Sequence, residues 1–207
     1  MDNIEAKVVN TKPGYDELTI FINGKPIDML LSELTENDYL LGLYPAWGND
    51  LLWKNESKLV WELIDKSKGT YNVPILLCPD DLDLSCTIIC AKVKKEKQIV
   101  YWEKIGSVSH DNYDRNIELQ SGILNTNTWS DGDWEKYGGT LAWCNVGDDE
   151  WKKWISENWN EEQKRRLHNY TNPYLQDDSN IEWFNIPKFI FDLDDYKKCV
   201  EVFRKEL

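Results

Sequence analysis

The sequence predicts an α+β protein, built mainly on antiparallel sheet with packed helices and a C-terminal helix. Dipeptides typical of turns join segments in which apolar and polar residues alternate, as in strands, and segments with the apolar spacing of a helix lie between them. Of the 207 residues, 41% are hydrophobic and 13% aromatic, enough for a buried core. We expect one α+β domain over residues 1–207, or two closely packed halves dividing near residues 107–139.

The first elements are predicted to be a hairpin and a short helix. Alternating apolar residues favour a strand over residues 17–22, between a Pro-Gly turn at 13–14 and an Asn-Gly turn at 23–24. Asp28 is expected to cap a short helix after the second turn.

A second helix and the central strands follow. "NESKLVWELIDKSKG" has helical spacing, with Asn55 as the expected cap. Residues 73–78 and 86–93 form short apolar runs, and the second is apolar on both alternating faces, which is typical of a strand covered on both sides. Residues 87–105 should form an antiparallel pair around a charged turn.

The second half gives weaker signals. "NIELQSGIL" is interpreted as a strand, "NTNTWSDGDWEKYGG" as an extended loop and "TLAWCNV" as a short strand. "GDDEWKKWISENW" predicts a helix whose tryptophans share one core-facing side. A strand interrupted at Pro187 and a closing helix with one apolar face complete the chain.

The composition indicates a class of partner. With 37 acidic and 24 basic residues, the net charge of −13 should repel nucleic acid and attract a basic protein, although solubility alone would also explain it. No apolar run is long enough to span a membrane, and the N-terminus has no secretory pattern, so we expect a cytoplasmic protein. The five cysteines form no disulfide framework.

Three aspartates, Asp80, Asp81 and Asp83, lie between the two central strands. They could bind Mg²⁺ or Ca²⁺ or serve a hydrolase, but the spacing fails the calcium-loop pattern, because Cys86 and Lys92 occupy its sixth and twelfth positions when Asp81 is the first. We therefore interpret the aspartates as a solvated turn that contacts a partner.

Cys86 and Cys90 are expected on one face of a strand, more than about 10 Å apart, too far to share a metal ion. We predict two free, buried thiols and neither a metal nor a cofactor.

No catalytic constellation is recognisable. The chain has only two histidines, His110 and His168, and it contains no nucleophile elbow, Walker loop or dinucleotide fingerprint. We predict that the protein is not an enzyme. The predicted partner contacts are the acidic turn and tryptophans in loops beside acidic residues, including Trp47 and the set Trp129, Asp131, Asp133 and Trp134.

Two stretches, "YPAWGNDLLWKNESKLVWELI" and "VPILLCPDDLDLSCTIICAKV", followed by "VYWEKIG", resemble immunity proteins of bacterial polymorphic toxin and contact-dependent inhibition systems. This resemblance covers about a third of the chain. It implies a small acidic cytoplasmic α+β protein that binds and blocks one cognate toxin, often a nuclease, without catalytic residues. The alternatives are a carboxylate-dependent hydrolase and a carbohydrate-binding module.

Overall fold

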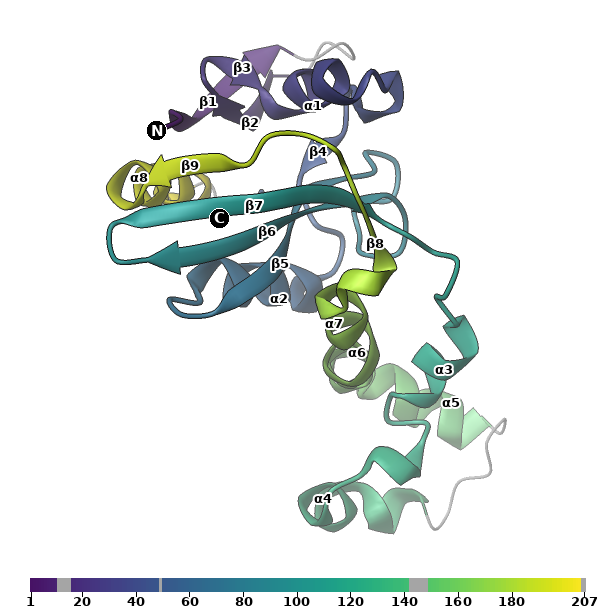
Figure 1. Ribbon diagram of the computed structural model, residues 1–207. Helices are drawn as coiled ribbons and strands as arrows, with labels where there is room; N and C mark the ends of the chain where they lie inside the picture. The colour runs from purple at the N-terminus through teal and green to yellow at the C-terminus, as the bar shows by residue number, and fades with distance from the viewer. Residues whose placement is uncertain (11–15, 49, 142–148, 206–207) are drawn as a thin grey trace. The chain divides into compact units, whose positions relative to one another are not determined.

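The computed structural model describes residues 1–10, 16–48, 50–141 and 149–205, and the protein belongs to the α+β class as predicted (Figure 1). The chain forms two compact units. Unit 1 comprises Met1–His110 and Leu175–Leu207, and unit 2 comprises Asp111–Tyr174. Unit 2 is therefore an insertion in the sequence of unit 1, and it begins within the region where the sequence suggested a division.

Unit 1 contains two antiparallel sheets. The smaller has the order β1-β2-β3, with β1 at Ile4–Asn10, β2 at Asp16–Ile22 and β3 at Lys25–Pro26. The larger has the order β4-β5-β6-β7-β8, and β9 also pairs with β7. Its strands are β4 (Tyr44–Pro45), β5 (Thr70–Leu77), β6 (Ile88–Glu96), β7 (Ile99–Val108), β8 (Ile181–Trp183) and β9 (Phe189–Asp192). The predicted first hairpin and the central antiparallel pair are confirmed. The predicted turn at 13–14 lies outside the described residues.

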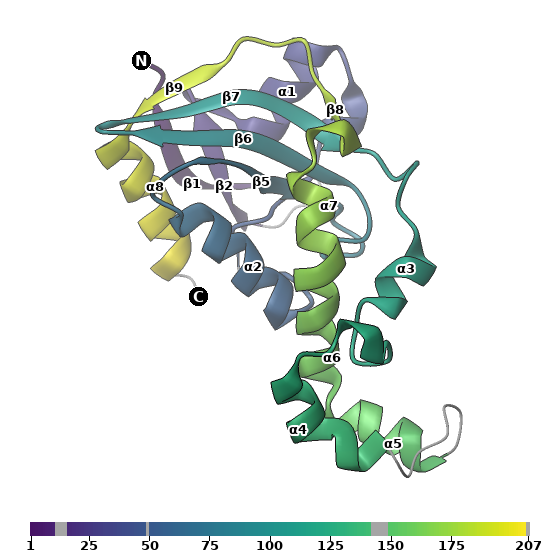
Figure 2. The same cartoon turned by 60° about the horizontal axis from the view of Figure 1, so that its bottom comes forward.

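The helices of unit 1 are α1 (Ile27–Thr35), α2 (Lys54–Asp65) and α8 (Leu193–Lys205), and α2 and α8 lie on the same side of the larger sheet (Figure 2). These helices were predicted, but the two predicted caps are wrong. The N-cap positions belong to Pro26 and Trp53, and neither side chain makes a capping hydrogen bond. The Asp28 carboxylate instead accepts a hydrogen bond from the Gly42 backbone N–H at 3.0 Å.

The core of unit 1 contains an aromatic cluster centred on Trp47, which has no exposed surface. Its ring lies edge-on to those of Trp102, Tyr196 and Phe203, with centroid distances of 5.7–6.0 Å. The indole Nε1 donates a hydrogen bond to the Pro74 carbonyl oxygen at 3.0 Å, so the polar atom is satisfied within the core. The prediction that Trp47 is a surface anchor is therefore wrong.

The described residues of unit 2 contain helices and helical turns and no strand. Its regular elements are α3 (Arg115–Gln120), the 3-10 turn η2 (Thr126–Thr128), α4 (Asp131–Leu141), α5 (Asp149–Glu157), α6 (Trp159–Arg166) and the π-helical turn η3 (Leu167–Thr171). The next helix, α7 (Asn172–Gln176), crosses the boundary into unit 1. The predicted strand at "NIELQSGIL" and the extended loop at "NTNTWSDGDWEKYGG" are therefore wrong.

Side-chain caps explain these helices. The Asp114 carboxylate accepts hydrogen bonds from the backbone N–H groups of Asn116 and Ile117 and begins α3. Ser130 and Asp133 bond reciprocally at the start of α4, as in a capping box. The predicted strand "TLAWCNV" begins inside α4, and its other residues lie outside the described part of the chain.

The tryptophan-rich helix α5 was predicted correctly and contributes to the small core of unit 2. The ring of Trp151, which is buried, stacks on that of Trp154 at 5.1 Å between centroids. The core itself contains Ile123, Trp129 and Tyr137, with Trp154 and Ile155 packed against them. Because so few apolar residues form this core, polar contacts have a larger part in holding unit 2 together.

Candidate functional site

The acidic segment singled out in the sequence is the β5–β6 turn, residues 78–87. The two strands close it: the Cys78 backbone N–H donates to the Thr87 carbonyl at 3.0 Å. Inside the turn, the Leu82 N–H donates to the Cys78 carbonyl at 3.1 Å, and Leu82 takes a left-handed φ of 49°. The turn therefore folds back over its own start instead of extending into solvent.

Contacts to the chain around the start of α2 fix the turn further. The Leu52 N–H donates to the Leu82 carbonyl at 2.8 Å, and the Leu84 N–H donates to the Glu56 carboxylate at 3.2 Å. The side chain of Leu84 is buried and anchors the turn in the core. Four hydrogen bonds and one buried side chain thus hold the shape of the turn, so little conformational entropy remains to be lost when it binds a partner.

The three predicted aspartates of the turn differ in role. Asp80 and Asp81 are exposed. Asp83 is half-buried and accepts hydrogen bonds from the Ser85 backbone N–H at 2.8 Å and from the Ser85 hydroxyl at 2.7 Å, so it shapes the turn. Next to the turn, the side chain of Leu52 is 61% exposed. An exposed apolar residue is therefore hydrogen-bonded through its backbone to a turn that carries exposed carboxylates.

The structure brings together three side chains that sequence reasoning kept apart. The thiol sulfurs of Cys78 and Cys86 and a carboxylate oxygen of Asp81 all lie within 4.8 Å of one another. A hydrogen bond with Asp81, then burial and the neighbouring Cys78, raise the pKa of the Cys86 thiol to about 11. Two soft sulfur donors and one oxygen donor are a set that can hold a metal ion.

The predicted arrangement of Cys86 and Cys90 is half correct. Cys90 is buried within β6, and this burial raises the pKa of its thiol. Cys86 is only half-buried and precedes β6, which begins at Ile88, so it does not lie on the strand face with Cys90. The missed signal was the spacing Cys78-x-x-Asp81, which matches the short ligand spacing of metal sites.

His110 also reaches the turn. Its ring Nε2 lies 2.6 Å from the Cys86 carbonyl oxygen, a contact between the segment after β7 and the end of the turn. This hydrogen bond gives His110 a positioning role at the backbone of Cys86.

The four residues predicted as partner contacts in unit 2 separate into two pairs. Trp134 is 49% exposed and Asp131 is also exposed, so both are accessible. Trp129 is only 9% exposed and packs in the core of unit 2, with its ring 5.0 Å from that of Trp134. Trp129 is therefore not a surface anchor, because most of its surface is already covered by its own unit.

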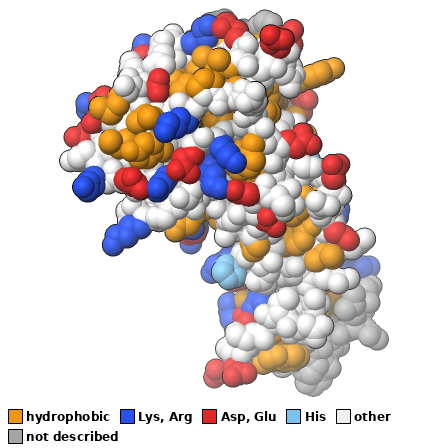
Figure 3. All heavy atoms as spheres, in the orientation of Figure 1, with side chains coloured by type: hydrophobic (Ala, Val, Ile, Leu, Met, Phe, Trp, Pro, Cys, Tyr) orange, Lys and Arg blue, Asp and Glu red, His pale blue; other side chains and the backbone are white. Residues whose placement is uncertain are grey.

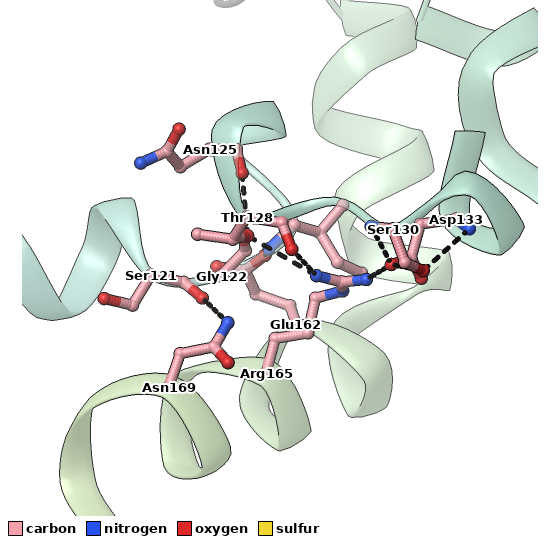
Figure 4. A network of polar contacts seen from close by, with 10 residues as sticks. Ser121, Gly122, Asn125, Thr128, Ser130, Asp133, Glu162, Arg165 and Asn169 are labelled. Atoms are coloured by element: carbon pink, nitrogen blue, oxygen red, sulfur yellow. Dashed lines mark hydrogen bonds and ion pairs between the residues drawn. The ribbon is translucent and has the colours of Figure 1, made fainter. Parts of the chain in front are cut away.

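Asp133 has an internal role as well. Its carboxylate accepts hydrogen bonds from the backbone N–H and hydroxyl of Ser130, and it forms an ion pair with Arg165, which also contacts Thr128 (Figure 4). The hydrogen bonds from Arg165 and Ser130 hold the pKa of Asp133 well below its usual range. A carboxylate so engaged caps α4 and ties it to α6, so it offers a partner little free charge.

The net negative charge does not gather in one patch on the face shown in Figure 3, where basic, acidic and apolar side chains are interspersed over unit 1. A binding surface must therefore be argued from local groups rather than from the total charge. Among the described helices, none is long and apolar enough to cross a membrane. No family model, curated protein or solved structure matches this chain.

Proposed function

We propose that this protein is a binding protein that neutralises a basic protein partner by attaching to it through the β5–β6 turn. One observation carries the proposal: Leu52, whose side chain is exposed, is hydrogen-bonded through its backbone to a fixed turn that carries the exposed carboxylates of Asp80 and Asp81. An apolar centre with a charged rim is the usual composition of a protein–protein interface.

The physical roles of the two kinds of group differ. The carboxylates of Asp80 and Asp81, together with a net charge of −13, would attract a cationic surface and accelerate the encounter. Leu52 would lose its water on binding and contribute mainly to the lifetime of the complex. The fixed backbone of the turn favours affinity, because its order need not be created on binding.

The resemblance to immunity proteins suggests which basic partner this is. We propose a cognate bacterial toxin, with a cationic nuclease domain as the preferred candidate and the cytoplasm as the compartment in which the two meet. A surface of carboxylates can occupy a cleft that normally receives phosphate groups. Under this proposal the protein acts stoichiometrically.

The test begins with capture of the partner from the native host, followed by binding kinetics and toxin activity measured with both proteins purified. Leu52→Ala should weaken binding at least about tenfold, mainly by faster dissociation. Asp80→Asn should slow association at low salt and have less effect at high salt.

Two substitutions on α8 are matched controls. Val202→Ala shortens another exposed apolar side chain, and Asp194→Asn neutralises another exposed carboxylate. Both controls should bind as the unaltered protein does. If Leu52→Ala and Asp80→Asn behave like these controls, the assigned surface is wrong. If the partner keeps its activity when saturated with this protein, the neutralising function is wrong.

A further inference from the structure

We propose that the β5–β6 turn binds a thiophilic divalent metal ion, zinc, through the sulfurs of Cys78 and Cys86 and the carboxylate of Asp81. This inference replaces the sequence-based prediction that the segment holds no metal. It shares Asp81 with the proposed partner surface but can be tested apart from it, because Leu52 and Asp80 are not among the ligands.

The course of the chain creates the site. Cys78 directly follows the last residue of β5, and Cys86 lies two residues before the start of β6, so the antiparallel pairing of the two strands brings both cysteines to the same end of the sheet. The hydrogen bond from the Cys78 N–H to the Thr87 carbonyl fixes this approach. The bond from the Leu82 N–H to the Cys78 carbonyl then returns the turn, with Asp81, toward the first cysteine.

The distances suit a tetrahedral ion. Zinc bonds of about 2.3 Å to sulfur and about 2.0 Å to oxygen place neighbouring ligand atoms roughly 3.5–3.8 Å apart. The three donor atoms lie within 4.8 Å of one another, so side-chain rotations of small amplitude suffice to reach this spacing. The separation by two residues between Cys78 and Asp81 matches the short ligand pair of many zinc sites.

The chemistry of the donors selects the metal. Two thiolates favour zinc or another soft ion over Mg²⁺ and Ca²⁺, which prefer oxygen ligands. On binding, each thiol releases one proton to solvent, and the sulfur lone pairs form the two bonds to the ion. Two thiolates, one carboxylate and the divalent ion together carry a net charge of −1, which water can solvate on the exposed side of the turn.

Three side chains leave the fourth tetrahedral position to a water molecule. His110 is not counted as a ligand, because its Nε2 faces the Cys86 carbonyl oxygen at 2.6 Å. That contact instead supports the backbone of a ligand residue, as groups around metal sites commonly do.

The experiment measures zinc in the full chain, purified under reducing conditions without chelator and without a metal-binding tag. We expect one zinc per chain, and X-ray absorption should find two sulfur neighbours and lighter oxygen neighbours. After exchange for Co²⁺, a thiolate-to-metal charge-transfer band should appear. Cys78→Ser, Asp81→Asn and Cys86→Ser should each lose the metal.

Two control substitutions leave the donor set intact: Cys199→Ser changes a buried thiol in α8, and Asp80→Asn changes the exposed neighbour of Asp81. Both should retain one zinc per chain. If a ligand variant fails to fold, the zinc content and the spectra of the unaltered protein still decide the question. The proposal is overturned if the unaltered protein binds no zinc at equimolar concentration, if its metal has no sulfur neighbours, or if a Cys78–Cys86 disulfide forms in the reduced preparation. It is equally overturned if Asp80→Asn loses as much zinc as Asp81→Asn.

Discussion

Replacing Glu162 by glutamine tests whether unit 2 depends on one buried carboxylate. Glu162 has no exposed surface. One carboxylate oxygen accepts hydrogen bonds from the backbone N–H groups of Ile123 at 2.5 Å and Leu124 at 3.2 Å, and the other pairs with Arg166 Nε at 2.6 Å. The absence of a side chain at Gly122 makes room for this arrangement, because a Cβ there would lie 2.1 Å from Glu162 Oε1.

The expected cost follows from these contacts. Glutamine offers one acceptor oxygen and an NH₂ group that can only donate, so either the backbone N–H groups or Arg166 lose their partner. An unpaired buried donor costs about 1–3 kcal/mol, and breaking a buried ion pair costs about 3–5 kcal/mol. These values overlap and do not add, so we expect Glu162→Gln to destabilise unit 2 by about 3–5 kcal/mol.

Hydrogen exchange read by mass spectrometry on peptides from residues 111–174 would measure this loss in unit 2 alone. The matched control is Glu157→Gln, which alters another i,i+4 pair in the same unit: Lys153 and Glu157 lie 3.9 Å apart and both are exposed. The control should cost less than about 0.5 kcal/mol. If these peptides are as well protected from exchange in the Glu162→Gln variant as in the Glu157→Gln variant, the buried carboxylate does not organise unit 2.

Two further predictions concern unit 1. Burial, followed by the negative charges of Asp28 and then Asp50, raises the pKa of Glu17 from 4.5 to about 7, so the protein should lose stability as pH rises from 4.5 through 7. Glu17→Gln should therefore match the unaltered protein at pH 4 and exceed its unfolding free energy at pH 8 by about 1–3 kcal/mol; an equal difference at both pH values would contradict this. Gly106→Ala in β7 places a Cβ 2.5 Å from the Glu182 carbonyl oxygen, so it should lower the unfolding free energy by about 1–3 kcal/mol and speed amide exchange in β8. The control Gly139→Ala, whose Cβ would meet nothing within 4 Å, should not destabilise the protein. Equal effects of the two substitutions would refute the packing argument.

The sequence predicted the strands and helices of unit 1 because their side-chain periodicity is strong. Residues 17–22 alternate cleanly, and the closing helix has a continuous apolar face that the structure buries through Tyr196, Val200 and Phe203. Such patterns follow directly from which side of an element faces the core.

Unit 2 was predicted poorly because its helices depend on caps more than on periodicity. α3 has no buried residue, so it presents no apolar stripe, and it begins where Asp114 caps it. α4 contains three glycines, which favour a loop by composition, yet Ser130 and Asp133 begin a helix there. Trp129 was assigned to the surface because the segment was taken for a loop; once the helix forms, its ring packs against Tyr137.

The metal-ligand cluster was missed for a related reason: the position of a side chain depends on where its strand begins. Extending the strand to residue 86 puts Cys86 on the same face as Cys90, whereas beginning it at Ile88 leaves Cys86 free to lie near Cys78. The same local geometry separates Asp80 from Asp81, because left-handed Leu82 and its bond to Cys78 direct the turn back toward its start. Two adjacent aspartates, both exposed, therefore have different neighbours. Of the two, Asp81 lies with the thiols, so Asp81→Asn should release the metal, whereas Asp80→Asn should weaken the attraction of a basic partner and leave the metal bound.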